Sequence, residues 1–290
     1  MLLMRNYFYF QKANIESMDP ILYSKYHHLQ ERDVNDFLLA CASLSNWCNL
    51  TKKIVMDVGC GSGNTSCAWL LSLFLQVKRL IAIDKSEDMI KLAKVLNPHP
   101  KIEYMVADIA DESSLECWEG TINKVISTWC FQFIADKRKA FRNVYNLLKP
   151  GGEGLKLFEV DSPYHQCYRC IIESPKWSHI FKSRSLEYPQ IYSENSSDVY
   201  YKRLLQELGF TVVLCKKKQK TFAFSSDEDC IGFLLSVFSL YKMVPDECME
   251  EFRNDLLESF LLYGGREASG RPVVYYNLMN VLVKRPNQTT

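Results

Sequence analysis

The sequence has no excess of charge of either sign. Its 35 lysine and arginine residues are balanced by 34 aspartate and glutamate residues, which leaves a formal net charge of +1 at pH 7. Proteins that bind nucleic acid or an anionic membrane surface usually carry a strongly basic face, so this balance argues against both partners. The one basic cluster, Lys216, Lys217, Lys218 and Lys220, fits a solvated edge strand or turn.

Long apolar runs are also missing. No stretch of about 18 apolar residues is present, so we expect no membrane span. The opening MLLMRNYFYF is interrupted by Arg5 and Asn6 and lacks a small-residue cleavage site, which argues against a secretory signal. We expect residues 1–17 to be a disordered extension of a cytoplasmic protein, with Met18 as a plausible start.

The cysteines do not show the spacing of a disulfide framework. Their number, 11, is odd and their spacing is irregular, which favours reduced thiols. Cys167 and Cys170 make a single CxxC pair, without a second pair or a histidine at zinc-finger spacing. Chance explains this pair better than metal or redox use, and we expect no metal cofactor.

What is present is an ordinary globular composition, 47% hydrophobic and 24% charged. The 290 residues allow one large α/β domain with an insertion, or two small domains. Strand-like and helix-like segments alternate, which predicts a mostly parallel seven-stranded sheet with helices on both faces. We favour a single domain over 18–290, with an N-terminal helical flap at 19–48 and an aromatic-rich cap at about 161–195. The expected strands are 54–58, 80–84, 102–106, 124–128, 155–160, 210–215 and 273–283, and the expected helices after the flap are 67–77, 86–96, 137–148, 198–208, 225–240 and 245–263.

The segment from Ile54 to Ser66, IVMDVGCGSGNTS, carries the clearest motif. An apolar strand passes through Asp57 into Gly59, Gly61 and Gly63, and a helical pattern follows. This strand, turn and helix make a nucleotide-binding unit, because only glycine lets the backbone approach a ligand closely at such a turn.

Three details narrow the choice of ligand. The glycines are spaced as GxGxG rather than the GxGxxG of dinucleotide enzymes. Asp57 would repel a pyrophosphate but attract an ammonium or sulfonium group. Asp84 ends the next strand about 20 residues further on, where a ribose diol is usually held. A nucleoside with positive charge and no phosphate fits all three, which describes S-adenosylmethionine (SAM).

Asp108 and Ile109 follow the third strand. Asp108 can hydrogen-bond an adenine amino group and Ile109 can pack against the ring, although Asp108 could instead only cap its loop. The complete predicted cofactor site is Asp57, Gly59, Cys60, Gly61, Gly63, Asp84, Lys85, Met89, Asp108, Ile109 and Ser127.

The acceptor is expected at the carboxyl end of the fourth strand, because ligands of doubly wound sheets bind there. The aromatic run Trp129–Phe133 occupies this position, although Phe131 could be a core residue. The flap adds Tyr23, His27, His28 and Gln30, each of which could equally be a surface or capping group.

Together, DVGCGSG, Asp84, Asp108 and NLLKPGG resemble the class I SAM-dependent methyltransferases. LYSKYHHLQERD, STWCFQFI, VYNLLKPGG and PKWSHIF are similar to segments of insect-type juvenile hormone acid methyltransferases, over about Asp19 to Arg285. The resemblance implies a Rossmann-like fold with a helical cap over the active site. It also implies esterification of a farnesoid carboxylate, such as farnesoic acid or juvenile hormone acid, with S-adenosylhomocysteine as the second product.

The resemblance further implies residue roles. Gln30 matches a flap glutamine expected to contact the acceptor carboxylate. The family pattern after the fourth strand ends in His-Trp, whereas this chain has Gln132 and Phe133. Trp129 could replace the missing indole donor only if it points the same way. The predicted catalytic residues are Gln30 and Trp129, and the predicted substrate site is Tyr23, His27, Gln30, Trp129, Gln132, Phe133, Tyr164 and Trp177.

A carboxylate is already ionised near neutral pH, so it needs alignment and exclusion of water rather than a general base or a metal. The expected partner is a small hydrophobic carboxylic acid, and the expected state is a monomer or weak dimer. Two alternatives stay open. One is a catalytically weak or silent SAM-fold protein that carries a lipid or hormone, which the Gln132-Phe133 departure favours and the intact SAM motifs oppose. The other is a methyltransferase for another small molecule.

Overall fold

The computed structural model describes residues 18–45, 53–73, 76–181 and 196–287. The predicted extension 1–17 and the later part of the predicted cap, 182–195, lie outside the described residues. The described chain forms two compact units. The sheet unit comprises the described residues within 28–162, 187–221 and 275–290, and the helical unit comprises those within 1–27, 163–186 and 222–274.

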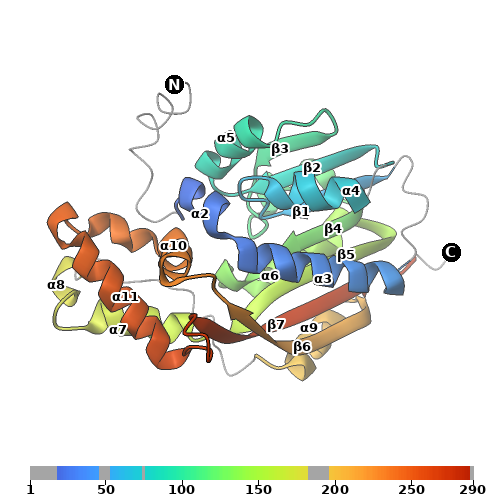
Figure 1. The fold of residues 1–290 in the computed structure, drawn as a ribbon. Coiled ribbons are helices and arrows are strands. Elements are labelled where there is room, and N and C mark those ends of the chain that lie inside the picture. The colour runs from blue at the N-terminus through green and yellow to red at the C-terminus, as the bar shows by residue number, and fades with distance from the viewer. Residues whose placement is uncertain (1–17, 46–52, 74–75, 182–195, 288–290) are drawn as a thin grey trace. The chain divides into compact units, whose positions relative to one another are not determined.

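A seven-stranded mixed sheet forms the core of the sheet unit (Figure 1), with the strand order β3-β2-β1-β4-β5-β7-β6. Strands β1 to β5 pair in parallel and β7 runs antiparallel to β5, which confirms the predicted mostly parallel sheet. The order reverses between β1 and β4, and ligands of such sheets bind outside the carboxyl ends of the strands at this point. The strands are β1 Ile54–Val58, β2 Arg79–Asp84, β3 Ile102–Val106, β4 Ile122–Thr128, β5 Leu148–Asp161, β6 Thr211–Ala223 and β7 Val273–Lys284.

Helices cover both faces of this sheet, as predicted. On β2, Ile81 and Ile83 belong to the same buried cluster as Phe141 of α6. Ala82, between them, belongs to a second cluster with Ile90 of α5. Successive side chains of a strand point to opposite faces, so the two clusters lie on opposite sides of the sheet. The helices of this unit are α3 His28–Leu44, α4 Leu71–Leu73, α5 Glu87–Leu96, α6 Lys137–Leu147 and α9 Asp198–Glu207, with short η1 Thr65–Leu70, η2 Glu112–Ser114, η3 Glu116–Trp118 and η4 Phe131–Phe133.

Two predicted helix starts are confirmed by their caps. The Ser86 hydroxyl accepts a hydrogen bond from Met89 N at 3.3 Å at the start of α5. The Asp19 carboxylate accepts from two backbone N–H groups of α2, and Pro20 is the first helical residue. Both arrangements satisfy donors that a helix leaves unpaired at its N-terminus.

The helix after the glycine turn differs from the prediction. The expected α-helix 67–77 is a π-helix, η1, followed by the single turn α4, and residue 76 already lies in a turn. Leu71 N donates to Ser66 O, one residue further back than in an α-helix. Ser66 within η1 is fully buried and bonds to Asp57. The periodicity of the sequence could not show this inserted residue, because a π-turn keeps a helical pattern.

Strand β6 is longer than predicted and includes the basic cluster. It is the last strand of the sheet, as expected for an edge. The Lys220 side chain is 23% exposed and its Nζ lies 2.9 Å from Asp36 Oδ2 and 3.5 Å from Asp33 Oδ1. This lysine is therefore partly exposed and paired with two acids of α3, whereas Lys216 and Lys218 are exposed, as predicted.

The helical unit is built from three separate stretches of chain, with an aromatic core. The Phe238 ring packs against Tyr168 and Phe252, with centroids 4.0 and 5.8 Å apart. Gly232 lies against Tyr26, and a Cβ added there would lie 2.4 Å from that ring. The helices of this unit are α2 Pro20–Tyr26, α7 Tyr164–Glu173, α8 Ser178–Phe181, α10 Asp227–Val237, η5 Ser239–Met243, η6 Asp246–Cys248 and α11 Met249–Tyr263. No helix among the described residues is long and apolar enough to cross a membrane.

Candidate active site

The glycine turn after β1 lies against the end of β2 and the segment after β4. Gly59 N and Cys60 N donate to Ile83 O at 2.8 and 3.0 Å. Gly59 and Gly63 have φ angles of +74° and +83°, which disfavour other residues. A Cβ added to Gly59 would lie 2.4 Å from Cys130 Cβ. The turn is therefore fixed at the reversal point of the sheet, where the fold places its ligand.

Asp84, the predicted ribose acceptor, stands at the end of β2. Its Oδ2 accepts a hydrogen bond from Gly61 N at 3.0 Å, and its Oδ1 accepts from Ser86 N at 2.9 Å. Burial raises the pKa of this carboxyl, and the two N–H donors oppose that rise. Each carboxylate oxygen has further lone pairs, so the group can still accept from a diol. The glycine turn itself orients the predicted ribose acceptor.

Asp57 lies in β1, with 1% of its surface exposed. Ser66 Oγ donates to its Oδ2 at 2.6 Å. Burial raises the pKa of Asp57 to about 6, against the hydrogen bond from Ser66 and the positive charge of Lys156. A carboxylate in such surroundings gains from a nearby cation, and the sulfonium and ammonium groups of SAM are cations. The acidic side chains at this end of the sheet therefore fit SAM.

Asp108 and Ile109 follow β3. Asp108 Oδ1 accepts from Ala110 N at 2.8 Å, which is the loop cap that the sequence left open as an alternative. Ile109 is 4% exposed and its carbonyl accepts from Asn143 Nδ2 at 2.8 Å. Both adenine roles stay predictions.

The other predicted cofactor residues differ in exposure. Met89 and Cys60 are buried, at 4% and 7% exposed, and Lys85 is exposed. Ser127 is 1% exposed and its hydroxyl donates to Val58 O at 2.8 Å. Ser127 thus ties β4 to β1 at the reversal point, and any contact of these four residues with SAM stays a prediction.

Trp129, directly after β4, has a strained backbone. Its φ angle is +55°, and no other non-glycine residue in the described part of the chain has a positive φ. For a bulky residue this conformation costs roughly 1–3 kcal/mol and is found mainly at functional sites. Trp129 N donates to Leu157 O at 2.7 Å, and its ring packs against Tyr276 with centroids 6.0 Å apart. The surrounding structure therefore holds this tryptophan in a conformation it would not adopt alone.

Three predicted acceptor-side residues carry buried polar atoms without a hydrogen-bond partner in the described part of the chain. These atoms are Trp129 Nε1, Gln30 Oε1 and Gln132 Oε1. Trp129, Gln30 and Gln132 are 9%, 6% and 4% exposed. Buried polar groups are nearly always paired, so an unpaired one points to a partner such as a ligand or water.

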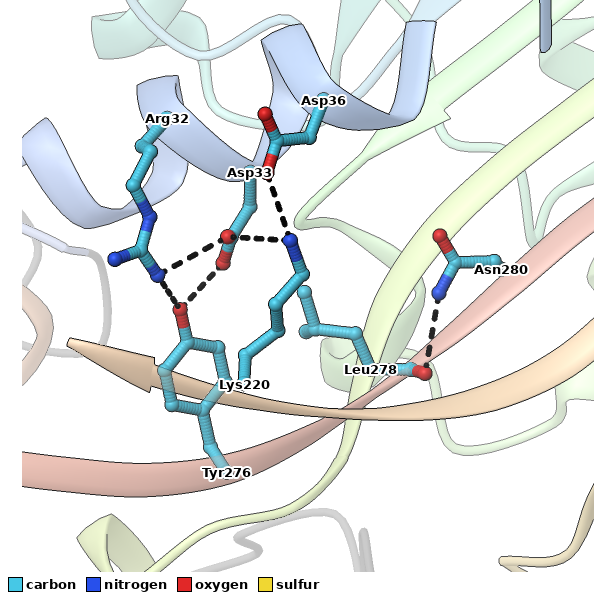
Figure 2. A network of polar contacts seen from close by, with 7 residues as sticks. All are labelled: Arg32, Asp33, Asp36, Lys220, Tyr276, Leu278 and Asn280. Atoms are coloured by element: carbon cyan, nitrogen blue, oxygen red, sulfur yellow. Dashed lines mark hydrogen bonds and ion pairs between the residues drawn. The ribbon is translucent and has the colours of Figure 1, made fainter. Parts of the chain in front are cut away.

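A chain of contacts connects Gln30 with Trp129. Gln30 and Asp33 are three residues apart on α3 and share one helix face. Tyr276 Oη donates to Asp33 Oδ2 at 2.5 Å (Figure 2). The Tyr276 ring also packs against Trp129. Asp33 and Tyr276 thus connect α3, the helix that carries Gln30, with Trp129.

The segment after Trp129 forms η4. Phe131 is fully buried and packs against Phe141 with centroids 4.8 Å apart, so it is a core residue, as the sequence allowed. Gln132 is buried and Phe133 is half-buried. A phenyl ring at position 133 offers no hydrogen-bond donor. Trp129 is the residue of this segment that carries an indole N–H.

Four predicted substrate residues lie in the helical unit and contact other residues of that unit. Tyr23 and His27 stack with centroids 5.6 Å apart, and the Tyr164 hydroxyl bonds to that of Tyr168. Trp177 Nε1 donates to Asp255 Oδ2 at 2.8 Å. The substrate roles of Tyr23, His27, Tyr164 and Trp177 stay predictions.

The sequence reasoning missed Asp33, Tyr276 and Lys156. Asp33 lies inside the LQERD segment, so its position beside Gln30 was a usable signal. Tyr276 and Lys156 lie in strands whose patterns read as ordinary, and only the strand order brings them to this region. Among the described residues, no group of three or more His, Cys, Asp or Glu side chains is placed to hold a metal ion.

Residues 56–155 match a family model described as a methyltransferase domain. Among solved structures, a candidate methyltransferase from Bacillus halodurans C-125 has a TM-score of 0.55 at 17% identity, and the match covers 88% of this chain and 100% of that one. The fold is therefore that of the class I methyltransferases, and with its glycine turn and acidic strand ends the chain is a SAM-dependent methyltransferase of class I.

Within that class, the chain is similar to juvenile hormone acid O-methyltransferases. The Bombyx mori enzyme is 25% identical over 238 residues, which cover 82% of this chain and 84% of that protein. The Drosophila melanogaster enzyme is 24% identical over 239 residues, which cover 82% of this chain and 80% of that protein. The resemblance expected from the sequence motifs is confirmed.

Proposed function

We propose that this methyltransferase esterifies the carboxylate of a small hydrophobic acid in the cytoplasm without a metal, and that a farnesoid acid is its first candidate acceptor. The observation that carries this proposal is the buried, unpaired indole N–H of Trp129 at the end of β4. A carboxylate oxygen is a strong acceptor for such a donor. The names of the Bombyx mori and Drosophila melanogaster relatives support the same acceptor class.

The chemistry of the acceptor-side residues suits a carboxylate. Gln30, Trp129 and Gln132 have neutral polar groups, which can orient an anion without neutralising it. An acceptor that is already ionised needs no proton removed, because free carboxyl groups titrate near pH 4. The residues therefore need to hold the acceptor in line and keep water away, which can be worth roughly 7–11 kcal/mol of the barrier.

When bound, SAM supplies an electrophilic methyl group on a positively charged sulfur. In the proposed site, Asp84 would accept hydrogen bonds from the ribose and Asp57 would balance the positive charge. The amide nitrogen of Gln30 and the indole N–H of Trp129 would donate to the two oxygens of the acceptor carboxylate. Both assignments of donors are proposals about the side chains described above.

The direct test incubates the purified protein with methyl-labelled SAM and a panel of farnesoic acid, juvenile hormone acids and plain fatty acids. Ester is detected by mass spectrometry, and SAM binding is measured in parallel by calorimetry. Trp129→Phe keeps an aromatic ring and removes the donor, so turnover should fall while SAM affinity stays. Trp118→Phe, which changes a buried tryptophan that precedes β4 in the chain, is the matched control.

A second candidate function is a silent SAM-fold protein that carries a lipid or hormone. It is favoured by Gln132 and Phe133, which stand where the family pattern has His-Trp. If SAM binds and no acid in the panel is methylated, another acceptor class is indicated. If neither SAM binding nor ester is detected, the carrier becomes the better description.

A further inference from the structure

The contacts between α3 and the sheet form a charged network that the proposed reaction does not by itself require. Asp33, Tyr276 and Lys220 come from α3, β7 and β6, and Figure 2 shows their polar groups converging with those of Arg32 and Asp36. Asp33 and Tyr276 are each 1% exposed. A buried carboxylate placed among three donors must have a role that outweighs its desolvation.

The Tyr276 hydroxyl and both carboxylate oxygens of Asp33 each have a polar partner in this network. Tyr276 Oη donates to Asp33 Oδ2 at 2.5 Å and accepts from Arg32 Nη2 at 2.9 Å. Asp33 Oδ1 lies 3.3 Å from Arg32 Nη2 and 3.5 Å from Lys220 Nζ. The Tyr276 hydroxyl thus has a partner in both its donor and its acceptor direction, and it cannot leave this position without breaking a charged contact.

The fixed ring of Tyr276 is the surface on which Trp129 packs. Trp129 holds a positive φ angle, and a strained residue keeps such a conformation only where neighbours determine it. On the other side of the network, Asp33 is one turn from Gln30 on the same face of α3. One pair of side chains therefore packs against Trp129 through Tyr276 and shares a helix face with Gln30 through Asp33.

We propose that Asp33 and Tyr276 are positioning residues that hold Trp129 and Gln30 in the arrangement that orients the acceptor. The proposal rests on the acceptor roles proposed above for Trp129 and Gln30. It also means that α3 is an anchored part of the acceptor site rather than a flap that opens freely. Tyr276 stays protonated, because burial and the charge of Asp33 raise its pKa, so it is not a general base.

The test uses Tyr276→Phe, which keeps the ring and removes the hydroxyl, and Asp33→Asn, which keeps the shape and removes the charge. Tyr275→Phe is the matched control, since Tyr275 is the next residue of β7 and is 51% exposed. Ser43→Ala, at an exposed position near the end of α3 and outside this network, is the control for α3. If Asp33→Asn does not fold, Tyr276→Phe alone still tests the proposal.

Three kinds of measurement are made on each variant: the SAM dissociation constant, the kinetic constants kcat and KM for the acceptor acid, and the indole resonances of the five tryptophans. The Trp129 signal is identified by its loss in Trp129→Phe. We expect Tyr276→Phe and Asp33→Asn to shift that signal and to lower kcat/KM for the acceptor about 10- to 100-fold, because small displacements at a reacting centre have large effects. SAM affinity and the Trp118 signal should be unchanged. In both control variants, SAM affinity, acceptor kinetics and indole resonances should match those of the unmodified protein.

An unchanged Trp129 signal in Tyr276→Phe would overturn the positioning role. A shifted signal with unchanged acceptor kinetics would overturn its importance for the reaction. If the unmodified protein forms no ester from any acid, the proposed function fails. In that case the Trp129 signal in Tyr276→Phe still decides whether the pair holds the tryptophan.

Discussion

Lys156 is the residue whose substitution should change stability most distinctively. It lies in the middle of β5, is 0% exposed, and its Nζ donates to Val125 O at 3.0 Å and Leu155 O at 3.2 Å. No carboxylate pairs with it directly among the described contacts. Burial lowers the pKa of Lys156 to about 7, partly offset by the charges of Cys130 and Asp57.

The sign of the pH effect follows from this lowered pKa. Between about pH 7 and pH 10.5 the unfolded chain binds a proton that the native lysine does not, so native stability rises with pH through this range. A pKa shift of this size changes the free energy of unfolding by roughly 5 kcal/mol over the full pH range, as an upper value. Between pH 6 and pH 8.5 the expected rise is about 2 kcal/mol.

Lys156→Met has a similar volume and removes the charge, so the variant should be more stable than the unmodified protein at pH 6. The stability difference should shrink by about 2 kcal/mol towards pH 8.5. The assay is guanidinium unfolding at several pH values, with Lys216→Met, an exposed lysine of strand β6, as the control. The raised pKa values of buried thiols that do not interact with Lys156, such as Cys41, affect both proteins equally and do not contribute to the difference. A difference that is flat from pH 6 to pH 8.5 would refute the reasoning.

Three further outcomes test the site. Asp84→Ala should weaken SAM binding about 10- to 100-fold in calorimetry, because a charged acceptor is lost. Glu87→Ala, at the exposed start of α5, is the control and should leave the affinity unchanged. Equal SAM affinities for the two variants would exclude the ribose role of Asp84. SAM affinity should rise as the pH rises through about 6, where Asp57 ionises, and Asp57→Asn should abolish this pH dependence. A pH dependence near 6 that survives in Asp57→Asn would belong to another group. Gln30→Ala should lower turnover about tenfold or more with SAM affinity retained, and intact turnover would show that Gln30 does not orient the acceptor.

The placement of the cofactor turn could be predicted from sequence because its signals are local. A strand that ends in glycines needs positive φ angles at those glycines, and Gly59 and Gly63 have them. Ser86 is a good N-cap wherever a helix begins, and the structure shows it in that role. These features depend on neighbours within a few residues, so the order of amino acids is sufficient to specify them.

Features that depend on distant segments were not predictable. The helical unit combines described residues within 1–27, 163–186 and 222–274, whereas the sequence indicated a cap only at about 161–195. The π-turn of η1 accompanies the contact of Ser66 with Asp57 in a neighbouring strand. Neither arrangement leaves a periodic signal, because each is decided by packing between elements.

Sequence alone determined the class of this protein: alternating strands and helices, the GxGxG turn, and acids at the ends of two strands define a SAM-dependent methyltransferase. Tertiary structure alone decided how the acceptor side is held. Trp129, whose φ angle is positive, donates its backbone N–H to Leu157 O and packs its ring against Tyr276, and Tyr276 bonds to Asp33, which is 243 positions away in the chain. Local propensity would place a tryptophan in an ordinary extended or helical conformation, and only long-range contacts can stabilise the strained one.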